Sequence, residues 1–557
     1  MTKRAVPADP ADPVANRLTR RALLAGAGAA AAVRLTPAHR IPAGSAAATL
    51  AVPPAFPAGI PLAQQTFRNW SREILVEGVW TATARTPQDV VVLADWARAQ
   101  GWRLRARGTG HTWTPLVADN GEDVSRTLLV DTTTYLTAVT VTGSQVTAQT
   151  GALLETVLTR LEAAGLGLAA TTAPGEMTVG GILAVGAHGT AVPTATEQPP
   201  QGAGFGTLSD LVTRLTAVVW DTAAGRYTLR TFTRSDPDIA AFLVHLGRAF
   251  LTEVTLQAAP NQRLRCQNFY DVDASVVFGP PGTTGRTFGS YLTKTGRLEA
   301  IWYPFTSVPW LKVWSVAPTK PLLSRQITAP YPYTFANSVS EEQSALLGAI
   351  AAGGGANTPD YCNWAMAVVG SGLITTGTWD IWGWSKNTQL YVKPSTLRIT
   401  EAGWAVQCAR ADVQRVVADF WSRYRSLVDA YAARGAYPVN CPVELRVTRT
   451  DPAAGTSPLL SPARSVGGLD TVVWLDFSTY PGTPGAFPFF REMEEWILAH
   501  YAVVRPEWSK GWGYTDAGPW TSLSWAASTV PPTAREVYDR WDPARVFGSE
   551  LVDALLG

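Results

Sequence analysis

The sequence has few charged residues, and this shortage limits its partners. Charged residues make up 16% of the 557 residues, and the formal net charge at pH 7 is +2. No basic run is interleaved with aromatic residues, which is the pattern of a nucleic-acid-binding surface. We therefore expect no nucleic-acid partner. The length favours two domains over one, and nothing in the sequence indicates an oligomeric state.

Histidine and cysteine are scarce as well. The sequence has five histidines and four cysteines, with no Cys-x-x-Cys pair and no spacing typical of metal ligands. We expect no metal site. Buried thiols acting as small hydrophobic groups are favoured over a disulfide, although one bridge stays open in an exported protein. The cysteines are Cys266, Cys362, Cys408 and Cys441.

Long apolar runs are also missing, because no segment reaches the roughly 20 apolar residues of a membrane-spanning helix. Near the amino terminus, Arg20 and Arg21 precede a weakly hydrophobic Ala/Gly/Leu run, and small residues follow at 46–48. A twin arginine before such a run is typical of a Tat export signal. The run is too rich in alanine and glycine for a strongly amphipathic helix on a membrane surface. We predict a Tat-type signal peptide at 1–48 and a protein that is secreted or held at the cell envelope.

Two glycine-rich stretches organise the rest of the chain. Residues 105–116 follow a predicted helix at 89–100 and a predicted strand at 102–104. Their Arg-Gly-Thr-Gly turn lets the backbone approach a ligand, and successive N–H groups form a concavity for an anion such as a pyrophosphate. Residues 173–190 form the second stretch. Neither contains a Walker A motif, and the first lacks the third glycine of a Rossmann turn.

Hydrophobic periodicity places further elements around these stretches. Before residue 260 the expected elements are strands at 128–131, 136–141, 145–150, 211–220, 227–231 and 248–257 and helices at 153–164 and 236–246. After residue 260, tryptophans become frequent, strands are expected at 298–303 and 443–449, and a helix at 411–433. Proline-rich segments at 318–332 and 482–488 are expected to be surface loops or borders of the cap. A further helix is expected after residue 491.

The two glycine-rich stretches resemble the flavin loops of the vanillyl-alcohol oxidase/p-cresol methylhydroxylase group of FAD enzymes. The first has the form Arg-Gly-x-Gly-His, and the second has Pro-Gly-x-x-Thr-Val-Gly-Gly followed by Gly-x-His-Gly-Thr. His111-Thr-Trp-Thr-Pro and Pro442-Val-Glu-Leu-Arg446 are most similar to the bacterial type II cholesterol oxidases. The resemblance covers nearly everything after about Trp70.

This resemblance implies an α+β fold with a cap. Residues 65–260 would be a two-subdomain, PCMH-type FAD-binding domain. Residues 261–490 would be an inserted substrate cap made of an antiparallel sheet with helices. Residues 491–557 would return to the FAD domain.

The resemblance also implies FAD and its binding residues. Several family members hold FAD covalently through a histidine at the position of His111, and this reading is favoured over a histidine that only lines the loop. His188 is expected to be a non-covalent loop residue near the cofactor, whereas His39, His245 and His500 have no motif around them. The residues expected to bind FAD are Arg107, Gly108, Thr109, Gly110, His111, Thr112, Pro174, Gly175, Thr178, Gly180, Gly181, Gly186, His188, Gly189, Thr190 and Val254.

Glu444 and Arg446 are the first candidates for catalysis. Residues two apart on a strand point to the same face, so the carboxylate and the guanidinium can share one site. A structural salt bridge is the alternative, but apolar neighbours and the match to the oxidases favour a functional pair. Glu299 is a candidate second acid or base, weighed equally against a solvent-facing charge on an edge strand. Asp476 is a weaker candidate.

The resemblance implies oxidation of a secondary alcohol, most concretely the 3β-hydroxyl of a sterol such as cholesterol, with O2 as acceptor and H2O2 as product. Glu444 would be the base, Arg446 would stabilise negative charge or gate oxygen, and Glu444 or Glu299 would move a proton in a 5-ene to 4-ene isomerisation. The tryptophan-rich cap would supply the apolar pocket, and sterol uptake implies contact with a membrane surface. The alternatives are an oxidase or dehydrogenase of a polyol, sugar or lactone, and an exported sterol- or lipid-binding protein on an inactive flavin fold.

Overall fold

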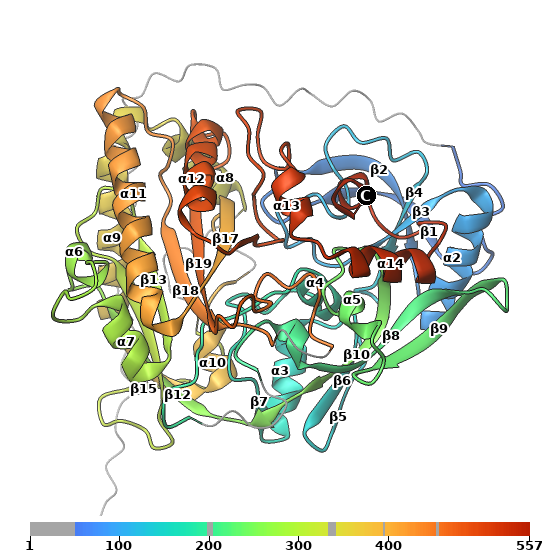
Figure 1. Ribbon diagram of the computed structural model, residues 1–557, viewed down its shortest axis with the longest axis horizontal. Helices are drawn as coiled ribbons and strands as arrows, with labels where there is room; N and C mark the ends of the chain where they lie inside the picture. Colours follow the sequence, from blue (N-terminus) through green and yellow to red (C-terminus); the bar gives the residue numbers. More distant parts are fainter. Residues whose placement is uncertain (1–50, 198–203, 332–340, 394–395, 453–455, 557) are drawn as a thin grey trace, which may run out of the picture. The chain divides into compact units, whose positions relative to one another are not determined.

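The computed structural model describes residues 51–197, 204–331, 341–393, 396–452 and 456–556 (Figure 1). The predicted signal peptide at 1–48 therefore lies outside the described residues, as does His39. The described residues form one compact unit. Up to residue 260 the described residues form three smaller sheets, of four, five and two strands, and after it one large sheet of nine strands.

A four-stranded sheet leads into the first glycine-rich stretch. Its order is β1-β2-β4-β3, and β4 is parallel to both β2 and β3. A capping box of Thr86 and Asp89 begins α2, and Gly101 in the left-handed region ends it. Because β3 ends at Arg107, the glycine turn follows the strand directly. The elements are β1 Leu62–Arg68, β2 Leu75–Thr83, α2 Pro87–Gln100, β3 Arg103–Arg107 and β4 Thr127–Asp131.

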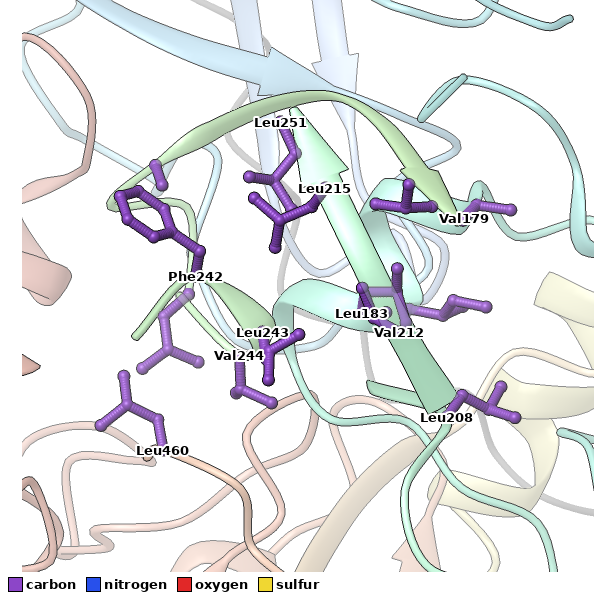
Figure 2. Packing of buried hydrophobic residues seen from close by; sticks show 14 of the residues in the cluster. Val179, Leu183, Leu208, Val212, Leu215, Phe242, Leu243, Val244, Leu251 and Leu460 are labelled. Carbon is purple, nitrogen blue, oxygen red and sulfur yellow. The ribbon is translucent and has the colours of Figure 1, made fainter. Parts of the chain in front are cut away.

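A five-stranded antiparallel sheet with β10 at its centre carries the second stretch. Its order is β5-β6-β10-β8-β9. Short helix α4 begins in the second stretch and packs on this sheet, and Figure 2 shows Leu460, from a segment after β18, reaching the same core. The elements are β5 Val139–Thr142, β6 Gln145–Gln149, α3 Leu154–Ala163, β7 Leu166–Gly167, α4 Val179–Ala184, η1 Leu208–Leu211, β8 Val212–Asp221, β9 Arg226–Thr233, α5 Ile239–Leu243, β10 Phe250–Gln257 and β11 Ala259–Pro260.

A nine-stranded sheet forms the centre of the cap. Its order is β15-β16-β12-β14-β13-β18-β19-β17-β20, antiparallel except between β15 and β16. Helices α7, α11 and α12 bury their apolar side chains against it. The strands are β12 Arg263–Phe269, β13 Arg297–Trp302, β14 Trp310–Val316, β15 Arg325–Gln326, β16 Asp380–Trp384, β17 Thr400–Cys408, β18 Val443–Arg449, β19 Thr471–Thr479 and β20 Val504–Pro506.

The remaining helices flank the cap or end the chain. Those of the cap are α6 Ala274–Val277, α7 Phe288–Thr295, α8 Glu341–Ala352, η2 Gly355–Asn357, α9 Thr358–Thr375, α10 Ser385–Gln389, η3 Arg410–Asp412, α11 Val413–Ala433 and α12 Ala486–His500. The last three are α13 Ser524–Ser528, α14 Pro532–Trp541 and α15 Glu550–Leu556. They share a core with α4 and β10. No helix of the described ranges is both long enough and apolar enough to cross a membrane.

Two local predictions were wrong. The helix expected at 236–246 is confined to α5, because the N–H groups of His245 and Leu246 both donate to Ala184 O and Leu246 has a φ of 53°. The loop expected at 482–488 contains the start of α12 at Ala486. This helix crosses the boundary expected after residue 490, and β20 then joins the large sheet. The domain boundaries stay a prediction.

Candidate active site

A cavity of about 380 Å³ lies between the two glycine-rich stretches and the cap sheet. It brings together both stretches and the Glu-x-Arg pair, which are far apart in the sequence. The predicted residues that line it are Gly108, Thr109, Gly110, His111, Thr112, Pro174, Thr178, Gly180, Gly181, His188, Glu444 and Arg446.

The other predicted residues lie outside this cavity. Gly189, Thr190 and Glu299 line a small neighbouring cavity, and Arg107 lines a groove behind Gly108 and Thr109. Three further positions that were expected to bind the cofactor line none of these three cavities. Val254 is buried in the second sheet, Gly175 faces Glu155 and Leu390, and Gly186 has a φ of 68° against Pro462.

The first stretch forms a concavity of backbone donors. Within the described residues, the N–H groups of residues 108–112 donate to no protein acceptor. A Cβ on Gly108 would lie 2.3 Å from Thr178 Oγ1, so only glycine lets the two stretches approach this closely. Such a row of free donors fits the pyrophosphate of a dinucleotide. The residues present therefore fit FAD.

Segments before and after the loop hold it in place. Trp70 N–H donates to Gly110 O at 2.8 Å, and Asn69 Nδ2 donates to Thr112 O at 3.0 Å. From the C-terminal side, Thr112 Oγ1 donates to Ser509 O at 3.0 Å. The turn is thus fixed by residues that have no glycine motif of their own, which is why sequence patterns did not indicate them.

The His111 side chain forms part of the cavity wall and is a neutral imidazole. Its ring centroid lies 4.8 Å from that of Trp70 at an angle of 30°, and its Nδ1 lies 3.7 Å from Glu176 Oε1. That distance is too long for a hydrogen bond. Burial, together with the positive charges of Arg398 and Lys510, lowers the pKa of His111 to about 3. A neutral ring keeps a lone pair available for chemistry.

His188 is held by contacts on several sides. Its ring stacks on Trp474 with centroids 3.5 Å apart, Nδ1 lies 2.8 Å from Gly189 O, and Nε2 lies 3.5 Å from Glu507 Oε1. Burial lowers the pKa of His188. Both the contacts and the burial suit a non-covalent loop residue.

His245 and His500, the two described histidines outside any motif, lie in different surroundings. His245 lines the cavity, accepts from Gly247 N–H at 3.2 Å, and has a pKa lowered by burial to about 4. Its place in the wall was not expected. His500 lies on the surface beside Asp419 and stacks on Trp496, which agrees with the absence of a motif.

Strand register assembles a row of charged side chains across the cap sheet. Lys312 of β14, Glu299 of β13 and Arg446 of β18 are direct neighbours in register. In the next row, Glu444 stands opposite Asp476 of β19. Glu299 is therefore in the interior of the sheet and only 1% exposed, so the solvent-facing alternative was wrong.

Five carboxylates and two cations meet at this face. Arg446 pairs with Asp476 and lies 3.5 Å from Glu444 and 3.9 Å from Glu299 and from Glu401. Lys510 Nζ lies 2.7 Å from Glu401, 2.9 Å from Asp476 and 3.3 Å from Glu507. Glu444 and Arg446 both lie on β18, and Glu507 and Lys510 both lie in the segment after β20. The other three carboxylates come from three different strands.

Burial and crowding set the protonation of this cluster. Burial raises the pKa of Glu444 to about 7, with Glu401 and Glu299 acting in the same direction and Arg446 against it. Burial and Glu507 raise the pKa of Asp476 well above its ordinary value. Glu507 is also buried, but Lys510 and His188 hold its pKa well below its ordinary value. The cluster therefore holds both acids and bases near neutral pH.

Tyr391 links Glu299 to the main cavity. It lines both cavities, and its hydroxyl donates to Glu299 Oε2. Its own N–H donates to Ala173 O at 3.1 Å, so the cap is tied to the second glycine-rich stretch at this point. No motif indicated Tyr391.

Beside the charged cluster, the cap also gives the cavity an apolar wall. Its lining includes Ile301, Tyr303, Trp310, Val368, Leu373, Leu397, Pro442 and Tyr480. Among the cap tryptophans, Trp310 lines the cavity, whereas Trp302 and Trp404 lie in the hydrophobic core. The four cysteines are buried, and no disulfide joins them in the described part of the chain. The described residues also contain no cluster of three metal-ligating side chains.

Sequence reasoning missed Glu401, Glu507 and Lys510. Glu507 and Lys510 are three residues apart in a tryptophan-rich segment, and this spacing is the one signal that was available. Glu401 lies on β17, whose nine residues are all buried, and a charge on such a strand is a weak signal without knowledge of its neighbours.

Comparison with known proteins agrees with this geometry. Residues 263–557 match the family described as "Cholesterol oxidase, substrate-binding", and residues 80–198 match the one described as "FAD binding domain". A solvent-stable cholesterol oxidase of known structure is 46% identical, with a TM-score of 0.88 over 91% of this chain and 100% of that chain. A cholesterol oxidase from B. sterolicum is 41% identical, with a TM-score of 0.88 over 92% and 100% of the two chains.

A more distant relative matches only in part. An L-gulonolactone oxidase from Scyliorhinus torazame is 22% identical over 249 residues, which cover 43% of this chain and 49% of that protein. The matched stretch thus spans about half the length of this relative.

Proposed function

The chain belongs to the cholesterol oxidase family of FAD-dependent alcohol oxidases, and from this premise we propose that it oxidises the 3β-hydroxyl of a sterol such as cholesterol with O2 to a ketosteroid and H2O2. The observation that supports this most is the single cavity in which free backbone donors, an apolar wall and a charged cluster meet. A rigid apolar alcohol fits such a wall.

Release of peroxide on adding sterol tests this proposal. We expect H2O2 with cholesterol and none above background with xylitol or a sugar lactone. Peroxide from the polyol but from no sterol would contradict the substrate class. Sterol-dependent reduction of an artificial dye without peroxide would instead indicate a dehydrogenase.

We propose that FAD is held covalently through His111. When bound, FAD accepts the hydride that leaves the carbinol carbon. Residues 108–112 would hold its pyrophosphate by their N–H groups, and His111 supplies a neutral ring nitrogen at the cavity wall. Yellow colour that stays with acid-precipitated protein would support the covalent bond, and colour released to the supernatant would contradict it.

Glu444 is the proposed base for the hydroxyl proton. It faces the cavity, and its pKa of about 7 suits a group that must be ionised at neutral pH yet take up a proton. Arg446 is proposed to stabilise developing negative charge or to gate oxygen entry. In either role the guanidinium would exchange its contact with Glu444 for one inside the cavity.

Glu299 is proposed to take part in the isomerisation of the 5-ene-3-ketone to the 4-ene-3-ketone. This step moves a proton from C4 to C6 and needs a group that can hold it. Glu299 does not line the main cavity, so it would act with Tyr391, whose hydroxyl it binds. Glu444 remains the other candidate for this proton transfer.

We also propose that the protein takes its substrate from a membrane surface. Between residues 344 and 379, Asp360 is the only charged residue. Leu373 of α9 lines the cavity, whereas Ile374 beside it is 63% exposed. Leu322 and Leu323 are also exposed, and Arg325 ties their segment to the end of α9 through Thr376 O.

Vesicle binding tests this surface. Leu322→Asp combined with Ile374→Asp should lower co-sedimentation with cholesterol-containing phosphatidylcholine vesicles by about tenfold, because buried apolar area drives such binding. Turnover of detergent-dispersed cholesterol should not change. Equal co-sedimentation of variant and wild type would contradict the proposal.

Export by the Tat route is proposed from the sequence of residues 1–48, which suits an enzyme that binds its cofactor before it leaves the cell. Replacing Arg20 and Arg21 by lysine should leave folded, flavin-containing protein inside the cell. Unchanged export of this variant would contradict the route.

A further inference from the structure

Three side chains that the proposed reaction does not use enclose the His111 imidazole. Trp70 lies against the ring, with centroids 4.8 Å apart and planes at 30°. Trp113 meets it edge-on at 6.3 Å. Glu176 Oε1 lies 3.7 Å from Nδ1. The ring is therefore restricted by an aromatic surface and by a carboxylate.

Backbone contacts fix Trp70 relative to His111. Trp70 N–H donates to Gly110 O, and the side chain of Asn69 donates to Thr112 O. Both chain neighbours of His111 are thus bonded to the segment that carries Trp70. The Arg398 guanidinium lies 4.6 Å from the Trp70 ring centroid and further limits its movement. Trp70 and the glycine turn behave as one unit.

Glu176 contacts the imidazole from the second glycine-rich stretch. His111 Nδ1 and Glu176 Oε1 are both buried, and neither has a hydrogen-bond partner within the described residues. Two buried polar atoms left without partners carry an energetic cost, which indicates a role other than stability. Glu176 is also the one carboxylate within 4 Å of the His111 ring nitrogens in the described part of the chain.

We propose that Trp70 and Glu176 are positioning residues for the attachment of FAD to His111. Trp70 sets the plane of the imidazole, and Glu176 sets its rotation and takes up a released proton. Attachment joins a ring nitrogen to the 8α-methyl carbon, releases one proton from each, and leaves two electrons on the flavin that O2 then removes. The inference rests on the covalent attachment proposed above.

The fraction of flavin that stays with acid-precipitated protein tests this role. Apoprotein is incubated with FAD, samples are precipitated over time, and pellet colour is divided by total bound flavin. We expect Trp70→Ala and Glu176→Gln to slow attachment by about tenfold, because loss of orientation lowers the rate of an intramolecular step. Trp70→Phe, which keeps an aromatic ring, should restore most of the rate.

Controls separate positioning from loss of structure. Tyr135→Ala and Glu550→Gln change exposed residues that do not line the cavity and should attach FAD at the wild-type rate. A purely structural role would lower total bound flavin but not its attached fraction, and this result would overturn the proposal. Attachment at the wild-type rate in both variants would overturn it as well. If wild-type protein itself releases all its flavin, the tether is absent and both proposals fall.

Discussion

Glu444 and Arg446 project from the same face of β18, with Glu444 Oε2 3.5 Å from Arg446 Nη2. The same guanidinium pairs with Asp476 and faces Glu299 and Glu401. One arginine therefore lies among four carboxylates, and Lys510 adds a second cation. Burial raises the pKa of Glu444 on the cavity wall, and the carboxylates of Glu401 and Glu299 act in the same direction. The cluster therefore retains protons near neutral pH.

Glu444→Gln should reduce turnover of cholesterol by about 100- to 10,000-fold, the usual range for loss of a general base. The amide cannot take up the hydroxyl proton, but it fills the same space, so flavin content should not change. Steady-state peroxide release measures the effect, with Glu495→Gln on the exposed face of α12 as a control. Near-normal turnover would remove Glu444 from the mechanism.

The rate of flavin reduction should rise with pH. Glu444 must be ionised to act as a base, and burial raises its pKa to about 7, so activity is low below this value and reaches a plateau above it. The apparent pKa belongs to the whole cluster, since its members titrate together. In Glu444→Gln this rise of the rate with pH should disappear. A wild-type profile that is flat between about pH 5 and 9 would contradict the assignment.

Arg446→Ala should lower the free energy of unfolding by about 3–5 kcal/mol, because it leaves buried carboxylates without their counter-charge. Denaturant titration measures this change. Arg415→Ala, which removes exposed ion pairs on α11, should cost about 0–1 kcal/mol. Equal stabilities of the two variants would show that Arg446 does not stabilise the cluster.

Gly108→Ala should abolish or strongly weaken FAD binding. The added Cβ would lie 2.3 Å from Thr178 Oγ1, so the two glycine-rich stretches must separate. Gly353→Ala is a matched control, since its Cβ meets no atom closer than 3.4 Å. Flavin absorbance per protein measures the effect. Full flavin content in Gly108→Ala would mean that close contact of the two stretches is not required.

Tyr391→Phe should slow isomerisation more than oxidation, by about tenfold, because Glu299 loses its hydrogen-bond donor and its link to the cavity. The 5-ene-3-ketone should then accumulate among the products. Chromatography of the product ketones measures the ratio, and Tyr135→Phe on the surface serves as the control. An unchanged product ratio would place the isomerisation on Glu444 alone.

Much of the fold and part of the site could be predicted from local patterns. The glycine turn after β3 and the Glu-x-Arg pair are local signals, because backbone conformation and strand alternation follow from adjacent residues. Family resemblance supplied the cofactor, the cap and the role of His111, which spacing alone does not give. The structure bears out the place of the turn beside the cavity.

The rest of the site depends on contacts that the sequence does not show. Lys510 and Glu401 reach Arg446 only because β17 lies beside β19 and the segment after β20 lies beside β17. The N–H of Tyr391 donates to Ala173 O, and this contact holds Tyr391 where its hydroxyl meets Glu299. Helix α5 ended early for a similar reason, since the acceptor that turns the chain is Ala184 of α4. Such long-range pairings override local periodicity.

Anaerobic addition of cholesterol to the purified protein is the most direct test of sterol oxidation by a bound flavin. We expect the visible flavin absorbance to bleach and to return when air is admitted, with peroxide and a ketosteroid as products. Absorbance that is unchanged with cholesterol and with other 3β-hydroxysterols would contradict it.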